Sequence, residues 1–195
     1  VTPGVTIAAN PPGPVCAGTS VTFTATASNT TGGTINYDFK VNGTSVQNSA
    51  SNTHTSSTLA NGNTVTCDIT ITGGNCLTST SATSNTITMA VNPNLTPSVN
   101  ITANPPGNIC SGTPVTFTAA ANNTGGGTIN YDFKVNGASV QNGALNTFTS
   151  STLTNGNTIT CDITVTGGNC MASTTATSNL ITMNVTPTVI PSVAI

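Results

Sequence analysis

A ten-residue segment of alternating hydrophobic and polar positions occurs twice in the chain. Residues 34–43 and 128–137 both read TINYDFKVNG. Tyr, Phe and Val alternate with Asp and Lys, which is the period of a β-strand with one buried and one solvated face. The closing Asn-Gly pair supplies residues that adopt positive φ in a tight turn. Each copy is therefore predicted to be the central strand of a β-sandwich.

The two copies belong to a repeat that covers almost the whole chain. A shift of 94 positions aligns residues 5–94 with residues 99–188 without a gap, and about 67 of the 90 pairs are identical. A period this long, filled with short alternating runs, indicates a tandem array of domains and not a solenoid of small units. We predict domain 1 at residues 1–92, a Pro-containing linker at 93–98 and domain 2 at 99–186.

Short strands bounded by turn residues fill the first copy. The predicted strands are residues 5–8, 21–27, 34–42, 45–47, 53–59, 64–72 and 85–91. Proline at residues 11, 12 and 14 ends the first strand, because proline cannot continue a ladder of hydrogen bonds. About seven antiparallel strands per domain are typical of an immunoglobulin-like sandwich. The predicted fold class is thus all-β, with two tandem immunoglobulin-like β-sandwich domains.

The inward positions of these strands define a predicted core in each copy. Residues 65, 67, 69 and 71 lie on one face of a single strand, and either Met89 or Val91 points inward beside Ile87. The predicted core of domain 1 is Phe23, Tyr37 or Phe39, Val41, Leu59, Val65, Ile69 and Ile87. The predicted core of domain 2 is Phe117, Phe133, Val135, Leu153, Ile159, Ile163 and Ile181.

Charged residues make up only 3% of the chain, and its net charge is −2. This surface cannot attract a phosphate polymer or an anionic membrane, so we expect no nucleic-acid partner. No apolar stretch reaches the roughly 18 residues of a transmembrane helix, so membrane insertion is not expected. A weakly charged surface rich in Thr and Asn suits a protein held in an array or outside the cell.

The ionisable residues are too few and too dispersed for a catalytic site. The single histidine, His54, is replaced by Phe148 in the second copy, so the abundant hydroxyl groups have no recurring base. Asp38, Lys40 and Asp68 allow two interpretations: an acid/base or Ca²⁺ site, or exposed ion pairs on neighbouring strands. Ca²⁺ needs several more oxygen ligands, so the ion-pair interpretation is favoured. We predict no catalytic residue, no metal site and no cofactor.

Several motifs, in order, resemble a known group of repeats. The strings CAGTSVTFTATASNTTGGTINYDFKVNG, SSTLANGNTVTCDIT, GGNC and TSNTITMAVNP are similar to the Ig-like, PKD-like repeats of secreted surface proteins and adhesins of Bacteroidetes. The resemblance implies an Ig-like fold, an extracellular or cell-surface location and a role in a stalk. Phe39 and Phe133 stand where these repeats usually carry Trp, which removes any carbohydrate-binding role based on exposed Trp.

Six cysteines, three per copy, are the remaining candidate chemistry. No CxxC motif is present, which argues against zinc. The resembling repeats keep one cysteine before the second strand and one after the sixth, which implies Cys16–Cys76 and Cys110–Cys170 disulfides, with Cys67 and Cys161 buried and free. Two alternatives stay open. The loops of Cys16 and Cys76 lie at opposite ends of a regular Ig sandwich, so Cys16–Cys67 fits that geometry better. A disulfide between adjacent domains is the other.

These features favour a non-enzymatic structural repeat unit of an extracellular filament or adhesin stalk. Its predicted partners are identical subunits or further repeats of the same chain, joined head to tail. The alternative is an adhesive binding module that recognises a glycan or a surface protein through its end loops. Residues 61–63 and 73–76 recur unchanged in the second copy, whereas a dedicated binding domain is expected to diverge at its loop tips. The structural interpretation is therefore preferred.

The final residues repeat the beginning of a domain. Residues 191–195 read PSVAI, and residues 97–101 read PSVNI at the same 94-residue period. Residues 187–195 are therefore predicted to be a linker and the first strand of a following domain, or a strand donated to another subunit. In either case Val193, Ala194 and Ile195 are the predicted assembly residues.

Overall fold

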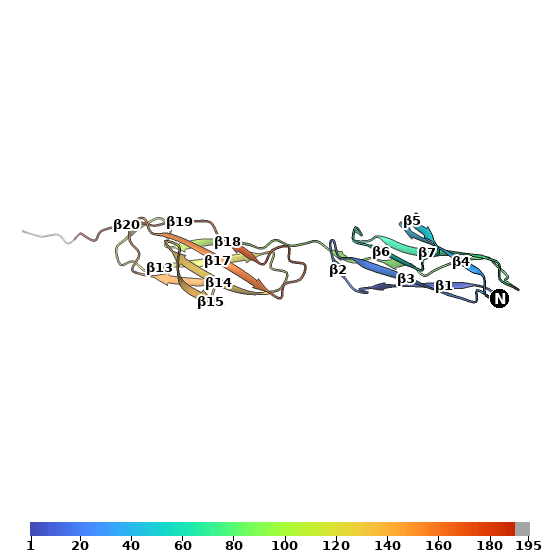
Figure 1. The fold of residues 1–195 in the computed structure, drawn as a ribbon. Coiled ribbons are helices and arrows are strands. Elements are labelled where there is room, and N and C mark those ends of the chain that lie inside the picture. The colour runs from blue at the N-terminus through green and yellow to red at the C-terminus, as the bar shows by residue number, and fades with distance from the viewer. Residues whose placement is uncertain (190–195) are drawn as a thin grey trace, which may run out of the picture. The chain divides into compact units, whose positions relative to one another are not determined.

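The computed structural model describes residues 1–189. The chain divides into two compact units, unit 1 at Val1–Pro93 and unit 2 at Asn94–Ile195, and both are drawn in Figure 1. The predicted assembly residues Val193, Ala194 and Ile195 lie outside the described residues. No helix in the described part of the chain is long and apolar enough to cross a membrane.

Each unit consists of ten strand segments in the same order. Unit 1 contains β1 (Gly4–Asn10), β2 (Val15–Cys16), β3 (Val21–Ser28), β4 (Thr34–Val41), β5 (Thr44–Ser49), β6 (Thr53–Ser56), β7 (Thr64–Thr72), β8 (Ser81–Thr83), β9 (Ile87–Thr88) and β10 (Val91–Asn92). Unit 2 contains β11 (Ser98–Asn104), β12 (Asn108–Cys110), β13 (Val115–Asn122), β14 (Thr128–Val135), β15 (Ala138–Gly143), β16 (Thr147–Ser150), β17 (Thr158–Thr166), β18 (Thr175–Thr177), β19 (Ile181–Thr182) and β20 (Asn184–Thr186).

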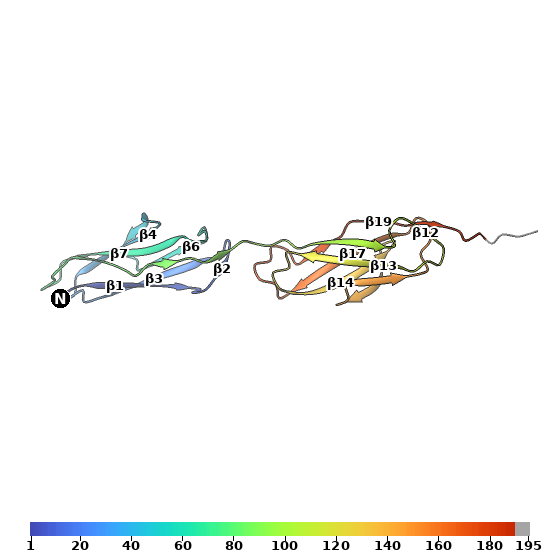
Figure 2. The ribbon, with the colours of Figure 1, turned by 180° about the vertical axis from the view of Figure 1, so that it is seen from behind.

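In each unit the strands form two facing sheets and a separate sheet of two short strands, β2 with β10 in unit 1 and β12 with β20 in unit 2. In unit 1 one sheet has the order β1-β3-β6, and the other has the order β5-β4-β7-β8 with β9 also paired to β7. Unit 2 repeats this arrangement, and Figure 2 shows β13 and β14 from the opposite side to Figure 1. A sheet of β1, β3 and β6 that faces a sheet in which β4 and β7 are neighbours is the immunoglobulin arrangement. The prediction of two Ig-like sandwiches is confirmed.

The strand pattern differs from the prediction in four places, and the first of these is the strand β8 (Ser81–Thr83), which was not predicted. Residues 15–16 form a strand that was not predicted, and it pairs in parallel with β10, so the strands are not all antiparallel. The fifth predicted strand, 53–59, ends at Ser56. The last predicted strand, 85–91, is divided into β9 (Ile87–Thr88) and β10 (Val91–Asn92), and the side chain of Asn85, ahead of β9, bonds to the backbone of Ile7 on the facing sheet.

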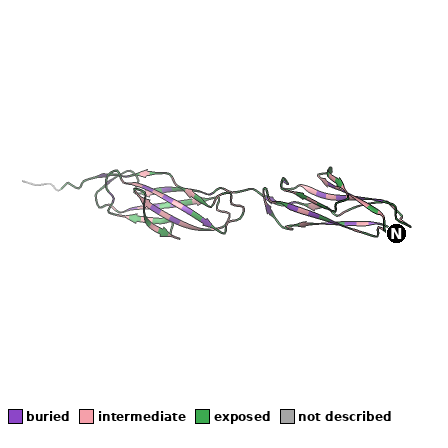
Figure 3. Cartoon of the chain, viewed as in Figure 1, coloured by how far each residue is buried: buried purple, intermediate pink, exposed green. Residues whose placement is uncertain are grey.

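The core of each unit lies between its sheets, and buried positions alternate with exposed ones along the strands (Figure 3). Both Tyr37 and Phe39 are buried, although the sequence analysis placed only one or the other in the core. Met89 and Val91 are also both buried. Four predicted core residues are only half-buried, because they lie near the ends of the sandwich: Val41, Ile87, Val135 and Ile181. The other predicted core residues are buried.

The register gives each unit two distinct ends. At the end where the first strand begins, which we call the leading end, Gly4 lies opposite Ser28 and Thr34 lies opposite Thr72. At the other end, the trailing end, β2 pairs with β10. β7 has nine residues, and at about 3.4 Å per residue it carries the chain roughly 27 Å from the trailing to the leading end.

Candidate functional site

Cys76 and Cys170 lie at the leading ends of their units. The carbonyl oxygen of Cys76 accepts a hydrogen bond from the nitrogen of Val1 at 2.6 Å. The carbonyl oxygen of Cys170 accepts one from the nitrogen of Leu95 at 2.7 Å. Cys76 is exposed and Cys170 is half-buried, and both have left-handed backbone conformations, with φ of 59° at Cys76 and 53° at Cys170. The loop is thus held in one geometry in both units.

Cys16 and Cys110 lie at the trailing ends. Cys16 ends β2 and pairs with Asn92, and Cys110 ends β12 and pairs with Thr186. Cys16 is half-buried and Cys110 is exposed. Each unit therefore has one surface cysteine at each of its two ends.

The predicted disulfides within a domain are wrong. Cys76 and Cys110 are free thiols, whereas Cys16 and Cys170 are disulfide-bonded. The physical reason is distance: a disulfide requires Cα atoms about 4.4–6.8 Å apart, but the two surface cysteines of a unit are separated by the length of its strands. The alternative Cys16–Cys67 disulfide is also wrong, since Cys67 is free.

Cys67 and Cys161 are buried and free, in agreement with the sequence prediction. Each has no exposed surface, and each thiol lies 3.7 Å from the carbonyl oxygen of the following aspartate. Burial raises the pKa of each thiol to about 11. Because the thiolate is the reactive form, these two side chains behave as core residues and not as nucleophiles.

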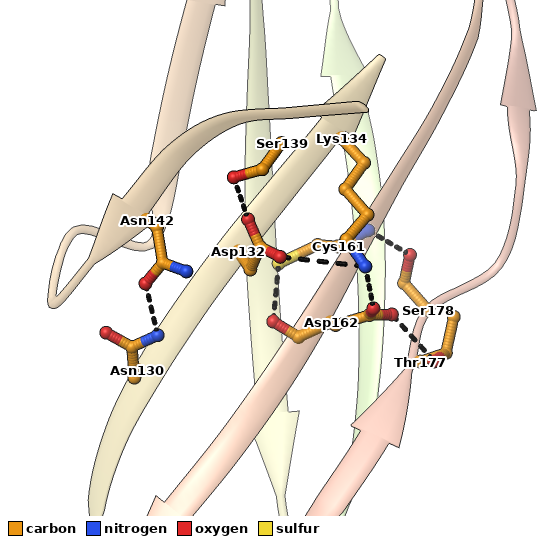
Figure 4. Close-up of polar contacts among 9 residues, drawn as sticks. All are labelled: Asn130, Asp132, Lys134, Ser139, Asn142, Cys161, Asp162, Thr177 and Ser178. Atoms are coloured by element: carbon orange, nitrogen blue, oxygen red, sulfur yellow. Dashed lines mark hydrogen bonds and ion pairs between the residues drawn. The ribbon is translucent and has the colours of Figure 1, made fainter. Parts of the chain in front are cut away.

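The predicted ion pairs are present on the outer face of the larger sheet in both units. In unit 2, Lys134 Nζ lies 2.6 Å from Asp162 Oδ2 and 3.6 Å from Asp132 Oδ2 (Figure 4). Asp132 and Asp162 are direct cross-strand neighbours, a like-charge pair that is destabilising by itself. The lysine contacts both carboxylates and offsets one of their two negative charges. In unit 1 Lys40 lies 2.6 Å from Asp68 and 3.5 Å from Asp38.

Hydrogen bonds and charge keep this cluster ionised. The hydrogen bond from Lys40 is the main cause of the lowered pKa of Asp68. For Asp162 partial burial acts in the opposite direction, but hydrogen bonds from Lys134 and Thr177 together hold its pKa below the ordinary value. The same contact with Asp162 raises the pKa of Lys134. Because Lys134 of β14 contacts Asp162 of β17, the ion pair favours the correct register of these two strands.

Beside this cluster in unit 2 lies an open polar hollow, lined by Asn130, Asn142, Asp162 and Thr177 among others. Its amide groups are occupied, because Asn130 Nδ2 donates to Asn142 Oδ1 at 2.6 Å. Within the described residues no group of three or more metal-ligating side chains occurs. The hollow is part of the ordinary surface of the sheet.

His54 is a core-facing residue and not a member of a site. Its ring stacks on Phe39 with ring centroids 5.7 Å apart, and its Nδ1 lies 3.2 Å from Gln47 Oε1. Burial lowers its pKa. The equivalent Phe148 packs against Phe117 and Phe133.

Sequence reasoning missed an asparagine that links the two sheets. Asn85 accepts a hydrogen bond from the backbone of Ile7 at 2.9 Å and donates one back at 3.2 Å. Asn179 makes the same pair of bonds with Ile101 at 2.8 and 3.1 Å. The sequence signal for this link is an asparagine at the start of the last predicted strand. It ends the string TSN in both copies.

No family model and no curated protein matches the chain. Among solved structures, the chain is similar to the fibronectin(III)-like modules of Clostridium thermocellum CbhA, at 16% identity and a TM-score of 0.38, over 92% of this chain and 94% of that one. It is also similar to the three N-terminal domains of the bacteriophage RB49 highly immunogenic outer capsid protein, at 16% identity and a TM-score of 0.37, over 93% of this chain and 59% of that one. For extracellular domains 3–5 of Drosophila OTK the identity is 12% and the TM-score 0.31, over 89% and 61% of the two chains. The fold assignment rests on the strand order and register within each unit.

Proposed function

We propose that the chain is a non-enzymatic structural repeat of an extracellular filament or adhesin stalk, which extends and spaces by adding identical units head to tail. The observation that carries the proposal is that unit 2 repeats the side-chain contacts of unit 1 as well as its sequence. Unit 2 reproduces the sheet order, the lysine between two aspartates and the asparagine link of unit 1. A specialised site in one unit would be expected to break this equivalence.

The interior and the loops support the same role. Among residues 1–189, no polar or charged side chain is buried, whereas binding and catalytic pockets place a few polar groups inside a concave site. The loop 61–63 is engaged in its own unit, since Asn61 Oδ1 accepts a bond from Val91 and Asn63 Oδ1 accepts one from Ala60. Such loops are built to close a sandwich and not to adapt to a ligand. A disulfide-bonded chain also fits an oxidising compartment.

Electron microscopy of the purified chain over a concentration series tests this proposal. We expect threads whose length increases with protein concentration, because a head-to-tail contact does not close on itself. The same preparation is also tested for binding on a glycan array, which examines the alternative function. A chain that stays a monodisperse monomer at every concentration, under both oxidising and reducing conditions, would overturn the filament role. Saturable glycan binding by that monomer would establish the binding module in its place.

A further inference from the structure

Of the two disulfide-bonded cysteines, one lies at a trailing end and the other at a leading end. Cys16 is a trailing-end cysteine and Cys170 is a leading-end cysteine, and both are bonded. The 94-residue shift relates Cys16 to Cys110 and Cys76 to Cys170. The remaining trailing-end cysteine, Cys110, and the remaining leading-end cysteine, Cys76, are exposed and free. A two-repeat chain thus retains one free thiol of each kind.

We infer that a disulfide joins the trailing-end cysteine of one copy of the chain to the leading-end cysteine of another copy, so that Cys110 bonds to Cys76 of a second copy. This inference deepens the proposed function and rests on it, because it assumes that repeats follow one another head to tail. The partner it names is another copy of the same repeat.

The free cysteines already have the geometry of the bonded ones. Cys76 and the bonded Cys170 share a left-handed backbone, with φ of 59° and 53°, and each accepts the corresponding backbone hydrogen bond near the start of its unit. Cys110 accepts a hydrogen bond from Thr113 at 3.1 Å, as the bonded Cys16 does from Thr19 at 3.0 Å. A preorganised loop loses little conformational freedom on bonding. Joining copies therefore needs no refolding of either end.

The buried thiols leave one pair of reactants for this linkage. Cys67 and Cys161 have no exposed surface, so an oxidant reaches only Cys76 and Cys110 among the free thiols of the folded chain. Within one unit the two ends are too far apart to bond. Joining unlike ends keeps every copy in the same direction, whereas joining like ends reverses the direction of successive copies.

The bond forms by two thiol–disulfide exchanges with a disulfide oxidant. The Cys110 thiolate attacks the oxidant and forms a mixed disulfide, and one oxidant thiolate leaves. The Cys76 thiolate of a second copy then attacks the Cys110 sulfur and expels the other oxidant thiolate. Two protein thiols are oxidised to one disulfide, and the oxidant is reduced to two thiols that take up the two protons.

Non-reducing electrophoresis of the intact chain with oxidised glutathione tests the inference. We expect the wild-type protein to form a ladder at multiples of 19.3 kDa that collapses to one band on reduction. Cys76→Ser and Cys110→Ser should each stay at the monomer position when incubated alone. An equal mixture of the two variants should give one dimer band and nothing larger, because it offers a single unlike pair. Mass spectrometry of wild-type peptides should show Cys76 joined to Cys110.

Several outcomes would overturn the linkage. They are dimerisation of either single variant as readily as of the mixture, peptides joining like cysteines, a monomer that has lost both free thiols, and no oxidised species at all. The double variant Cys76→Ser/Cys110→Ser separates this inference from the proposed function. Threads of undiminished length formed by the double variant leave the filament role intact and sink the disulfide link. A covalent ladder without threads would support the disulfide link and overturn the filament role.

Discussion

The two units differ most informatively at one core position, which is His54 in unit 1 and Phe148 in unit 2. Both residues lie in the smaller sheet, where His54 is opposite Phe23 of β3 and Phe148 is opposite Phe117 of β13. His54 stacks on Phe39 of the facing sheet, with planes 29° apart. The ring centroid of Phe148 lies 6.1 Å from that of Phe117 and 5.9 Å from that of Phe133. The same backbone thus accepts an ionisable ring and an apolar ring.

The two rings differ in hydrogen bonding and in ionisation. The histidine has a hydrogen-bond partner in Gln47, but burial disfavours its charged form. Phenylalanine has no such penalty and adds an aromatic contact. Unit 1 should therefore be the less stable unit at acidic pH, while the rest of the core makes the two units energetic equivalents. The following substitutions test that equivalence.

The largest effect should come from removing the central phenylalanine of either unit. Phe39 and Phe133 have no exposed surface, so Phe39→Ala and Phe133→Ala should each lower the free energy of unfolding of their own unit by about 3–5 kcal/mol. Each unit has one tyrosine, Tyr37 or Tyr131. Tyr131→Phe leaves a fluorophore in unit 1 alone, and Tyr37→Phe leaves one in unit 2 alone.

Chemical denaturation followed by tyrosine fluorescence in these backgrounds resolves the two units. Val140→Ala is the matched control, because Val140 is 46% exposed and its loss should change stability by less than about 0.5 kcal/mol. A loss below about 1 kcal/mol for Phe133→Ala would contradict its place in the core.

Removing the asparagine link should have the next largest effect. Asn85→Ala and Asn179→Ala each leave a partly buried N–H and C=O of the first strand without their side-chain partner. The expected cost is about 1–3 kcal/mol in the affected unit. Asn142→Ala is the control, because the Asn130–Asn142 bond is exposed. Equal losses for Asn142→Ala and Asn179→Ala would refute the special role of the link.

Exchanging the aromatic rings should remove the difference between the units. His54→Phe is expected to stabilise unit 1 by about 0.5–1.5 kcal/mol at neutral pH through the added aromatic contact. Phe148→His should destabilise unit 2 in return. The measurement is denaturation of each unit at pH 8 and at pH 5.

The sign of the pH effect follows from proton binding. The folded state holds the pKa of His54 below its unfolded value of 6.5, so the unfolded chain binds more protons between these two values. The stability of unit 1 should be full above pH 6.5 and fall as the pH decreases toward the folded pKa. His54→Phe should abolish this slope, and an unchanged slope would assign it to another group.

The smallest effect should come from the exposed ion pairs. Lys134→Met leaves Asp132 and Asp162 facing each other, so a small loss of stability is expected that shrinks at high salt. Adding Asp162→Asn should recover most of it. The lowered pKa of Asp162 means that its contribution is present above its unfolded pKa and is lost as the pH falls through the folded pKa. A large loss, insensitive to salt, would show that the cluster has more than a role in register.

Much of this architecture can be predicted from the sequence because it depends on local periodicity. Alternation in TINYDFKVNG predicts the central strand, and the 94-residue repeat predicts two units. Strands four and seven are neighbours in the Ig arrangement, so the position of Lys40 between Asp38 and Asp68 followed as well. The burial of Cys67 followed from its place between two apolar positions of one strand face.

Contacts between segments without a periodic signal were decided only by the tertiary structure. The two residues of β2 are too few to show alternation, and their parallel pairing with β10 depends on where the chain returns at the end of the sandwich. The link made by Asn85 likewise depends on the facing sheet. The cysteine partners depend on distance in space: the strands carry Cys16 and Cys76 to opposite ends of one unit, and a disulfide bridges only a few ångströms. Sequence similarity between the copies identified equivalent cysteines, but only the positions of the two ends showed which ones cannot meet.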